Sequence, residues 1–367
     1  MVYQKTVKIA KFEGIKILSM NILDQNIKLS QAQIYLLKNL AVLSDVPITA
    51  KQLFEFLSID QQMHLQYFDA LHSLVPEWLE YKNSYYIFHK EKVKKFIRYY
   101  PIRVNDLYLL INYLKKIYYN VNYNNIKLLE RYEPYILSIL KNFKQPSILL
   151  SQLFLAYAQF LSYKENYQEA LLTIQQAVSY LQQQNNASAI LVQAYTEMSF
   201  IYLKINNLEK ALQLALKAKE ILAKIHRTIP RIEINLEFLL GEISFKYKEF
   251  SQAIHHYLQV INKLNNKKIE QPRLLLYIYL QLSNAFKYQG KYEKSLHYIF
   301  LAEKSLSFLT EPEKKIFGEQ IKLQKKGILG LSVLNKFKTK FLLYTFLAIA
   351  MLFSLLTILI FLKTLFK

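Results

Sequence analysis

The sequence of 367 residues has no cysteine and only six glycines. Without thiols there is no disulfide and no cysteine-ligated zinc site, which agrees with a reducing compartment. The glycines, at 14, 241, 290, 318, 327 and 330, leave no GxxxxGKS/T phosphate loop. None of the seven histidines stands in a HExxH pattern, and no serine nucleophile elbow or paired-carboxylate motif is present. We therefore expect a non-enzymatic protein without a metal or a cofactor.

Acidic residues are also scarce, with 27 against 48 basic residues and a formal net charge of +21. Of the basic residues 42 are lysine and six are arginine, and isoleucine, asparagine and tyrosine are abundant too, as in proteins of AT-rich genomes. Nucleic-acid contacts favour arginine more strongly than this. We therefore do not expect nucleic acid as a partner, whereas part of the charge would favour anionic lipid headgroups.

The chain instead contains an internal repeat. A Tyr, Phe or Leu is followed three residues later by Ala or Ser at four evenly spaced places, in steps of 41, 42 and 42 residues. Small residues recur 12 positions before each of these Ala or Ser residues, and Ala or Val recurs 7 positions after them. Helices cross closely only where side chains are small, so the spacing predicts a helical-repeat array. The pairs are Tyr167/Ala170, Leu208/Ala211, Phe250/Ala253 and Tyr292/Ser295, and the flanking positions are Ala158, Ser199, Gly241, Ser283 and Ala177, Ala218, Val260, Ala302.

This pattern resembles the tetratricopeptide repeat (TPR) over about residues 149–309. Three-residue polar or glycine-bearing turns, centred on Glu165, Asn206, Lys248 and Gly290, join the predicted helices of each copy. The usual period of the family is about 34 residues, so the surplus residues between copies are expected to lengthen the second helix and the loop after it. The early tryptophan of the family is also absent. A HEAT-like repeat, whose period is longer, is the alternative, but the internal spacing favours the TPR.

The C-terminal end carries the one long hydrophobic run. Residues 341–362 contain no charge over 22 positions, and as a helix they would span about 33 Å against roughly 30 Å of hydrocarbon. A buried core helix is the alternative, but the run is uncharged on every face. Eight lysines lie from Lys314 to Lys340 and only two follow the run, so the basic flank is expected in the cytoplasm. We predict a single-pass, tail-anchored membrane protein with the bulk of the chain cytoplasmic.

Residues 30–100 show a different pattern. Ser30 and Thr49 are placed to cap two amphipathic helices, and a third follows Asp60. Two short runs, 78–81 and 85–88, then predict a β-hairpin before a basic helix, 91–100. This order resembles the winged-helix segment of STAND-class signalling ATPases. The resemblance implies the fold and not the ATPase activity, because the phosphate loop is missing.

The third helix of this segment, 60–73, contains no lysine or arginine. In a DNA-binding winged helix this element enters the major groove, and phosphate contacts need cations. We therefore expect a structural or protein-contacting role. The predicted fold is mainly α, with an N-terminal segment (1–29), a winged-helix-like domain (30–100), a helical connector or degenerate capping repeat (101–148), a TPR-like α-solenoid of four repeats (149–327), a basic juxtamembrane segment (328–340) and a single transmembrane helix (341–362).

In TPR arrays the first helix of each repeat lines a concave groove. The Lys/Asn carboxylate clamp of chaperone-binding members is matched here by Asn284 alone, so an acidic chaperone tail is not expected. Phe200 and Tyr277, flanked by lysines, suit a peptide or a helix, and packing between helices is the alternative. By the resemblance the groove residues are Gln159, Thr196, Phe200, Lys204, Asn235, Glu242, Lys246, Tyr277, Asn284 and Lys287.

The sequence therefore predicts a non-enzymatic scaffold or receptor that binds a protein or peptide at the cytoplasmic face of a membrane. The alternative is a membrane-held transcriptional regulator that uses the winged helix to bind DNA.

Overall fold

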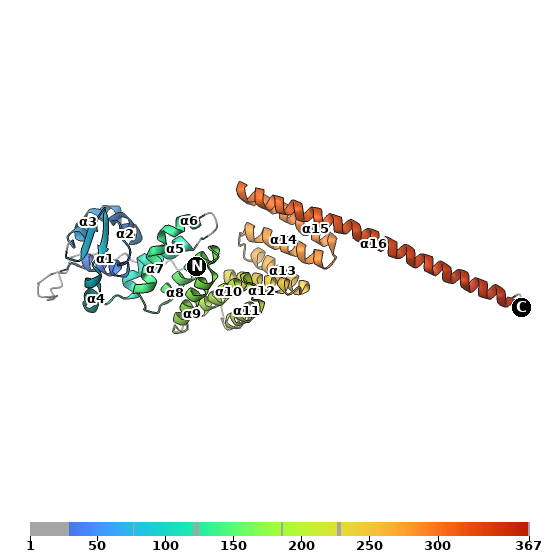
Figure 1. The fold of residues 1–367 in the computed structure, drawn as a ribbon, viewed down its shortest axis with the longest axis horizontal. Coiled ribbons are helices and arrows are strands. Elements are labelled where there is room, and N and C mark those ends of the chain that lie inside the picture. The colour runs from blue at the N-terminus through green and yellow to red at the C-terminus, as the bar shows by residue number, and fades with distance from the viewer. Residues whose placement is uncertain are drawn as a thin grey trace. The chain divides into compact units, whose positions relative to one another are not determined.

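The structure, a computed structural model, describes residues 29–365 except 76, 120, 122–124, 185 and 226–228, and it describes side-chain surroundings as far as Met351. The described part is mainly helical (Figure 1). It divides into two compact units, an N-terminal unit up to Ile201 and a C-terminal unit from Tyr202. Of the expected N-terminal segment, residues 1–28 lie outside the described residues.

The N-terminal unit begins with three helices, a hairpin and a fourth helix, in the order expected. Ser30 and Thr49 each form a capping box, in which the side chain accepts a hydrogen bond from the third helical N–H and a glutamine reaches back. Asp60 caps a 3-10 turn, so the third α-helix begins later than expected, at His64. The elements are α1 (Gln31–Val42), α2 (Ala50–Phe56), η1 (Gln61–Met63), α3 (His64–His72), β1 (Leu79–Lys82), β2 (Tyr85–Phe88) and α4 (Lys90–Tyr99).

The two strands form an antiparallel ribbon in which Leu79 lies opposite Phe88 and Lys82 opposite Tyr85. Ile48, between α1 and α2, adds a bridge to Tyr86. Inward-facing rings close the core beneath the ribbon, where Trp78, Phe88 and Phe96 meet edge to face with centroids 5.6 to 6.2 Å apart. The alternation of buried and exposed side chains along β2 thus anchors the ribbon on α4.

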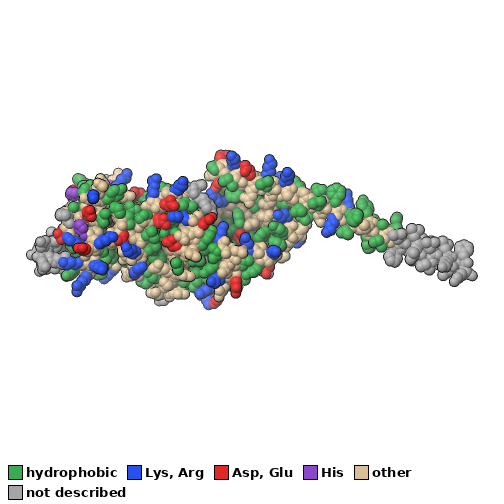
Figure 2. All heavy atoms as spheres, viewed as in Figure 1, with side chains coloured by type: hydrophobic (Ala, Val, Ile, Leu, Met, Phe, Trp, Pro, Cys, Tyr) green, Lys and Arg blue, Asp and Glu red, His purple; other side chains and the backbone are tan. Residues whose placement is uncertain are grey.

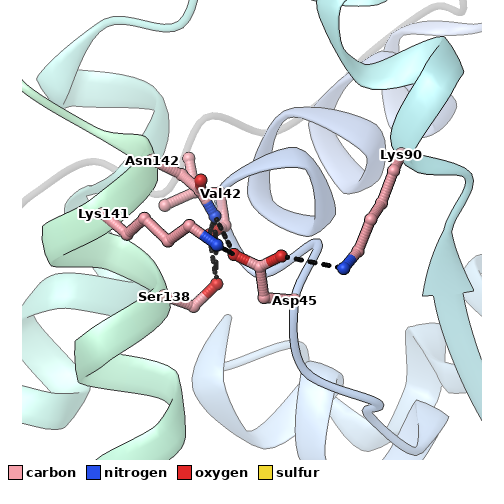
Figure 3. A network of polar contacts seen from close by, with 6 residues as sticks. All are labelled: Val42, Asp45, Lys90, Ser138, Lys141 and Asn142. Carbon is pink, nitrogen blue, oxygen red and sulfur yellow. Dashed lines mark hydrogen bonds and ion pairs between the residues drawn. The ribbon is translucent and has the colours of Figure 1, made fainter.

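The expected connector, 101–148, consists of short helices that pack against both neighbouring parts of the N-terminal unit. Asp45, after α1, accepts hydrogen bonds from Lys141 Nζ at 2.8 Å and Asn142 Nδ2 at 3.2 Å, and its other oxygen lies 3.3 Å from Lys90 Nζ (Figure 3). The Lys141 hydrogen bond is the main reason that the pKa of Asp45 is lowered. Ser138 Oγ donates to Val42 O at 2.8 Å. The elements are η2 (Val104–Leu107), α5 (Tyr108–Tyr118), α6 (Ile126–Leu129), η3 (Glu130–Tyr132) and α7 (Glu133–Asn142).

The remaining helices confirm the helical repeat. The second helix of every copy begins at the residue that defines it in the sequence, namely Tyr167, Leu208, Phe250 and Tyr292. Pro230 and Pro272 occupy the first helical position, where a missing N–H has no cost. The helices are α8 (Ile148–Tyr163), α9 (Tyr167–Leu181), α10 (Ser188–Lys204), α11 (Leu208–Ala223), α12 (Pro230–Lys246), α13 (Phe250–Asn266), α14 (Pro272–Tyr288), α15 (Tyr292–Ser305), η4 (Leu306–Phe308) and α16 (Glu311–Leu365).

The recurring small residues are the helix contacts, as predicted, and all twelve positions are buried. Between α14 and α15, Ser283 Oγ and Ser295 Oγ lie 3.0 Å apart, a distance that only short side chains permit. Between α12 and α13, a Cβ on Gly241 would lie 2.7 Å from Cε1 of Tyr257. The glycine therefore makes room for the tyrosine ring that crosses it.

The four turns close in the same way. Their central residues, Glu165, Asn206, Lys248 and Gly290, have φ of 60°, 60°, 63° and 72°. In each turn the next residue donates its N–H to a carbonyl five positions earlier, as Lys291 does to Phe286 at 2.9 Å. This is the Schellman closure, which needs a left-handed residue at its centre. It reverses the chain within three residues and brings the paired helices together.

The long helix α16 packs on α15 at its beginning and then continues beyond it (Figure 1). Ile321 and Ile328 are buried against α15, whereas every side chain described after Ile328 is exposed or half-buried. The segments predicted as 328–340 and 341–362 thus belong to one continuous helix. Among the residues whose surroundings are described, no helix has enough length and apolarity to cross a membrane. The second half of the predicted span, 352–362, lies outside that range.

Candidate partner-binding surfaces

In the C-terminal unit three of the predicted groove residues belong to one polar network centred on Glu242. Its carboxylate accepts hydrogen bonds from Tyr257 OH at 2.6 Å, Tyr277 OH at 3.1 Å and Gln281 Nε2 at 3.1 Å. Gln281 Nε2 also donates to Tyr277 OH at 2.8 Å. Residues on α12, α13 and α14 therefore meet at one carboxylate, and its position is fixed by three donors.

Burial governs the protonation of this network. It raises the pKa of Glu242, while hydrogen bonds from Tyr257 and Tyr277 and the charge of Lys204 lower it. Burial likewise raises the pKa of Tyr277, and the Glu242 carboxylate raises it further. The Tyr277 hydroxyl is therefore held as a neutral donor toward Glu242.

The network continues from Asn284 to α16. Gln324 Nε2 donates to Asn284 Oδ1 at 2.8 Å and to Leu280 O at 3.2 Å. Asn284 Nδ2 lies 3.5 Å from Gln281 Oε1, at the outer limit of a hydrogen bond. Asn284 thus joins the Glu242 network to a helix that the groove prediction did not include.

The other predicted residues of the C-terminal unit lie on its surface. Lys204, Asn235 and Lys246 are exposed, and Lys287 is half-buried with its Nζ 4.8 Å from the centre of the Tyr288 ring. Tyr277 meets Phe238 edge to face at 5.6 Å. α12 and α14 thus present cations and aromatic rings, among them the exposed Tyr288.

In the N-terminal unit Gln159 is paired with a residue that the sequence analysis missed. Gln159 Nε2 donates to Glu197 Oε1 at 2.6 Å, between α8 and α10. Desolvation by burial raises the pKa of Glu197 to about 7. Gln159 also lines a cavity of about 110 Å³, together with Lys115, whose Nζ donates to Gln152 Oε1 at 3.1 Å. Burial lowers the pKa of Lys115.

Thr196 is placed differently from the groove prediction. It is buried, and its hydroxyl donates to Val192 O at 2.7 Å within α10. Helix geometry turns it toward the core, because Tyr195 and Ser199 on the same helix are buried as well. Phe200 is half-buried and has contacts of its own. Of the N-terminal candidates, Gln159 and Phe200 are the residues with accessible surface.

Four polar residues that carry these contacts were not among the predicted groove residues: Glu197, Tyr257, Gln281 and Gln324. Glu197 and Gln281 interrupt largely apolar helical stretches, and this is the signal that would have marked them. Gln324 stands among lysines and carries no such signal. A charged or amide side chain in an apolar stretch needs a buried partner. The partner itself is set by packing between helices and is not visible in the sequence.

α3 and the preceding η1 expose large apolar side chains among polar ones such as Gln66 and Asp69. Leu65 is 74% exposed, Met63 and Phe68 are exposed too, and the Phe68 ring stacks on His72 at 6.0 Å. α3 carries no lysine or arginine. This surface offers a phosphate backbone no cationic contacts and is suited to an apolar neighbour.

Histidine and carboxylate side chains are not grouped for metal binding in the described part of the chain. His256 Nδ1 lies 2.8 Å from Glu237 Oε2, and this contact lowers the pKa of Glu237. The adjacent His255 is exposed. The His256 ring therefore makes a contact between α13 and α12, and the two adjacent imidazole rings do not face a common metal site.

No protein-family model and no curated protein matches the chain. Solved structures do match. Crystal structures of BtubC from P. vanneervenii and of a STAND protein with a tetratricopeptide repeat sensor from Pyrococcus horikoshii are 15% and 16% identical, each with a TM-score of 0.43. The apo form of RapI is 13% identical with a TM-score of 0.45.

The extent of these matches differs. The BtubC match covers 59% of this chain and 86% of that one, the STAND match 85% and 48%, and the RapI match 65% and 64%. The chain thus spans about half the length of the STAND protein. The description of this chain as TPR-like rests on its own geometry, namely paired helices, buried small residues and identical turns.

Proposed function

We propose that the chain is a non-enzymatic receptor or scaffold that binds a protein or peptide on the first helices of its repeats. The observation that carries the proposal is the surface of α12 and α14. There exposed Asn235 and Lys246 lie on helices that also hold the half-buried Tyr277 and Asn284 in an ordered polar network. A fixed surface with cations and an aromatic edge suits a peptide or helix, because few side chains must be ordered on binding.

We further propose that α16 anchors the protein in a membrane, with the repeats on the cytoplasmic side. From Phe341 to Met351 all described side chains except Thr345 are exposed, and most are large and apolar (Figure 2). Phe341, Phe346 and Met351 are 68, 70 and 70% exposed. An apolar surface on every face of a helix is costly in water and favourable in hydrocarbon. The uncharged sequence to Leu362 and the lysines before Phe341 support the same orientation.

The alternative of a DNA-binding regulator is less well supported. α3 has no lysine or arginine and exposes the acidic Asp69, so it lacks the cations that a phosphate backbone requires. Its exposed Leu65 and Phe68 are better suited to a protein contact within a receptor.

Site-specific photocrosslinking in intact membranes tests the partner proposal. A photoreactive residue at Asn235 or Lys246 of the full chain should give the same discrete adduct from both positions, because both lie on α12 and are exposed. The same residue at Lys217, exposed on the second helix α11, is the matched control and should not give that adduct. An adduct of equal yield from Lys217, or none from α12, would contradict a partner on the first helices.

A further inference from the structure

A second surface, outside the predicted groove, has the chemistry of an anion site. A cavity of about 350 Å³ lies in the C-terminal unit, between the beginning of α15 and one face of α16. Its lining includes three lysines, Lys291, Lys294 and Lys336, and one acidic residue, Glu293. The lining thus has a formal excess of two positive charges, three minus one. Its volume lies within the range of about 300 to 1,000 Å³ typical of small-ligand pockets.

The three cations lack carboxylate partners. Within the described part of the chain none of them forms an ion pair, whereas Lys325, about three turns before Lys336 on α16, pairs with Glu303 at 2.8 Å. Lys291 Nζ instead donates to a neutral amide, Gln289 Oε1, at 2.9 Å. Lys294 Nζ lies 5.7 Å from the centre of the Phe286 ring. Like charges around one cavity repel each other, so an anion in the cavity would be favoured.

The uncharged side chains that line the cavity indicate which class of anion would bind there. Ser332 and Asn335 line it beside Lys336, at positions i, i+3 and i+4 of α16, and therefore on one face of that helix. A hydroxyl, an amide and ammonium groups are all hydrogen-bond donors, and phosphate oxygens are acceptors. A phosphomonoester carries about −1.5 to −2 charges at neutral pH. Its charge matches the excess of the lining.

The place of the cavity along α16 indicates where the phosphate comes from. Lys336 precedes the first residue of the apolar run, Phe341, by five positions, or about 7.5 Å of helix. The polar layer of a bilayer is about 5 to 7 Å thick on each side of the hydrocarbon. If the run from Phe341 enters the membrane, Lys336 lies at the outer edge of the headgroup layer and the rest of the cavity lies just outside it.

We propose that this cavity binds the phosphomonoester headgroup of an anionic phospholipid, with Lys291, Lys294 and Lys336 as the cationic contacts. This assignment rests on the proposed membrane anchor for the source of the phosphate, and on the cavity itself for its chemistry. Glu293 opposes the bound charge and limits the affinity.

Calorimetric titration of the full chain in neutral detergent micelles tests the assignment. The probe is dioctanoyl phosphatidic acid, compared with dioctanoyl phosphatidylcholine and with inorganic phosphate. Phosphatidic acid should bind saturably and more tightly than either. Lys336→Gln should weaken it by about threefold to fivefold, as expected for a solvent-accessible charge contact. Glu293→Gln should strengthen it by a similar factor, because the repulsion is removed.

Lys338→Gln is the matched control. Lys338 is exposed, lies at nearly the same height on α16 and does not line the cavity. Two positions along a helix correspond to a rotation of about 200°, so its side chain lies on the opposite face. If Lys336→Gln and Lys338→Gln lower the affinity for phosphatidic acid equally, the binding is general electrostatic attraction, and the proposed site is overturned. Equal affinity for inorganic phosphate would overturn the lipid assignment, and no saturable binding would overturn both.

Two separate experiments distinguish a wrong assignment of the phosphate site from a wrong assignment of the membrane anchor. Alkaline extraction of membranes tests the anchor alone, since a spanning helix stays in the pellet. The micelle titration needs no bilayer and tests the cavity alone. The variants change exposed side chains, and an unchanged thermal unfolding temperature will show that each one is folded.

Discussion

At the level of single residues, two carboxylates make polar contacts between repeat helices. Glu242 accepts hydrogen bonds from three side chains in the C-terminal unit, whereas among the described residues of the N-terminal unit Glu197 accepts one, from Gln159. A buried carboxylate with few donors favours its protonated form. Glu197 is therefore the side chain through which pH would act on the contact between α8 and α10.

We expect the free energy of unfolding to fall as pH rises from about 4.5 to about 7 because of Glu197. Its pKa is raised from 4.5 to about 7 in the folded protein, so the folded state binds the proton more tightly. The contribution to the free energy of unfolding is complete below about pH 4.5 and is lost as pH rises to about 7. Glu197→Gln should remove this dependence.

The measurement is the unfolding temperature of the full chain between pH 5 and 8, with and without Glu197→Gln. The unfolding temperature of the variant should rise relative to that of the natural protein as pH rises. Glu209→Gln, which removes one charge from an exposed position on α11, controls for net charge. A difference between variant and natural protein that is constant with pH would show that Glu197 does not titrate in this range.

At the scale of elements, the turns determine the repeat. All four reverse the chain with one left-handed residue, yet only one of the four central residues is glycine. A residue with a Cβ is destabilised by about 1 to 2 kcal/mol in this conformation, and asparagine is less affected because its short polar side chain can hydrogen-bond locally. Glu165 and Lys248 therefore hold a conformation that their side chains disfavour.

Lys248→Gly should raise the free energy of unfolding by about 1 kcal/mol, because the left-handed penalty outweighs the added freedom of the unfolded chain. Gly290→Ala, in the equivalent turn, should lower it by a similar amount. A Cβ on Gly290 would meet no atom within 4 Å, so the backbone conformation alone sets this cost. Denaturant titration of both variants measures the two changes in the free energy of unfolding. A lower value for Lys248→Gly would contradict the expected role of the turn.

At the scale of the whole molecule, α16 links the repeats to the proposed anchor. Ile328 is its last buried residue among those described and Phe341 begins the apolar run, so about 20 Å of helix separate them. No break interrupts α16 between these residues. A continuous helix would hold the last repeat close to the membrane surface and would transmit its orientation.

The absence of native cysteine makes this topology directly measurable. Ser307→Cys is exposed just before α16, and a second version of the chain carries one cysteine added after Lys367. In sealed vesicles with the cytoplasmic face outward, an impermeant maleimide should label Ser307→Cys and should label the added cysteine only after detergent treatment. Equal labelling of both in intact vesicles would rule out a span.

The local features could be predicted because they depend on neighbours in the chain. Ser30 and Thr49 cap helices through residues three positions later, and Tyr167 and its equivalents begin helices where the repeat placed them. The small residues are buried because their spacing keeps them on one helix face. The groove was predicted less well. Thr196 was expected in the groove but lies in the core. The resemblance assigns repeat positions to a helix face, but it does not say how α10 is rotated about its own axis.

The repeat, the helix ends, the turns and the uncharged C-terminal run can be read from the amino-acid sequence, because each follows from short-range periodicity and backbone preference. Which polar groups form hydrogen bonds with one another depends on how the helices pack. Glu242 accepts a hydrogen bond from Tyr257 on the following helix, and Asn284 accepts one from Gln324, 40 residues away. The cationic cavity joins residues from two helices in the same way. Such contacts depend on how helices cross, and the cost of leaving a buried polar group unpaired selects among the crossings.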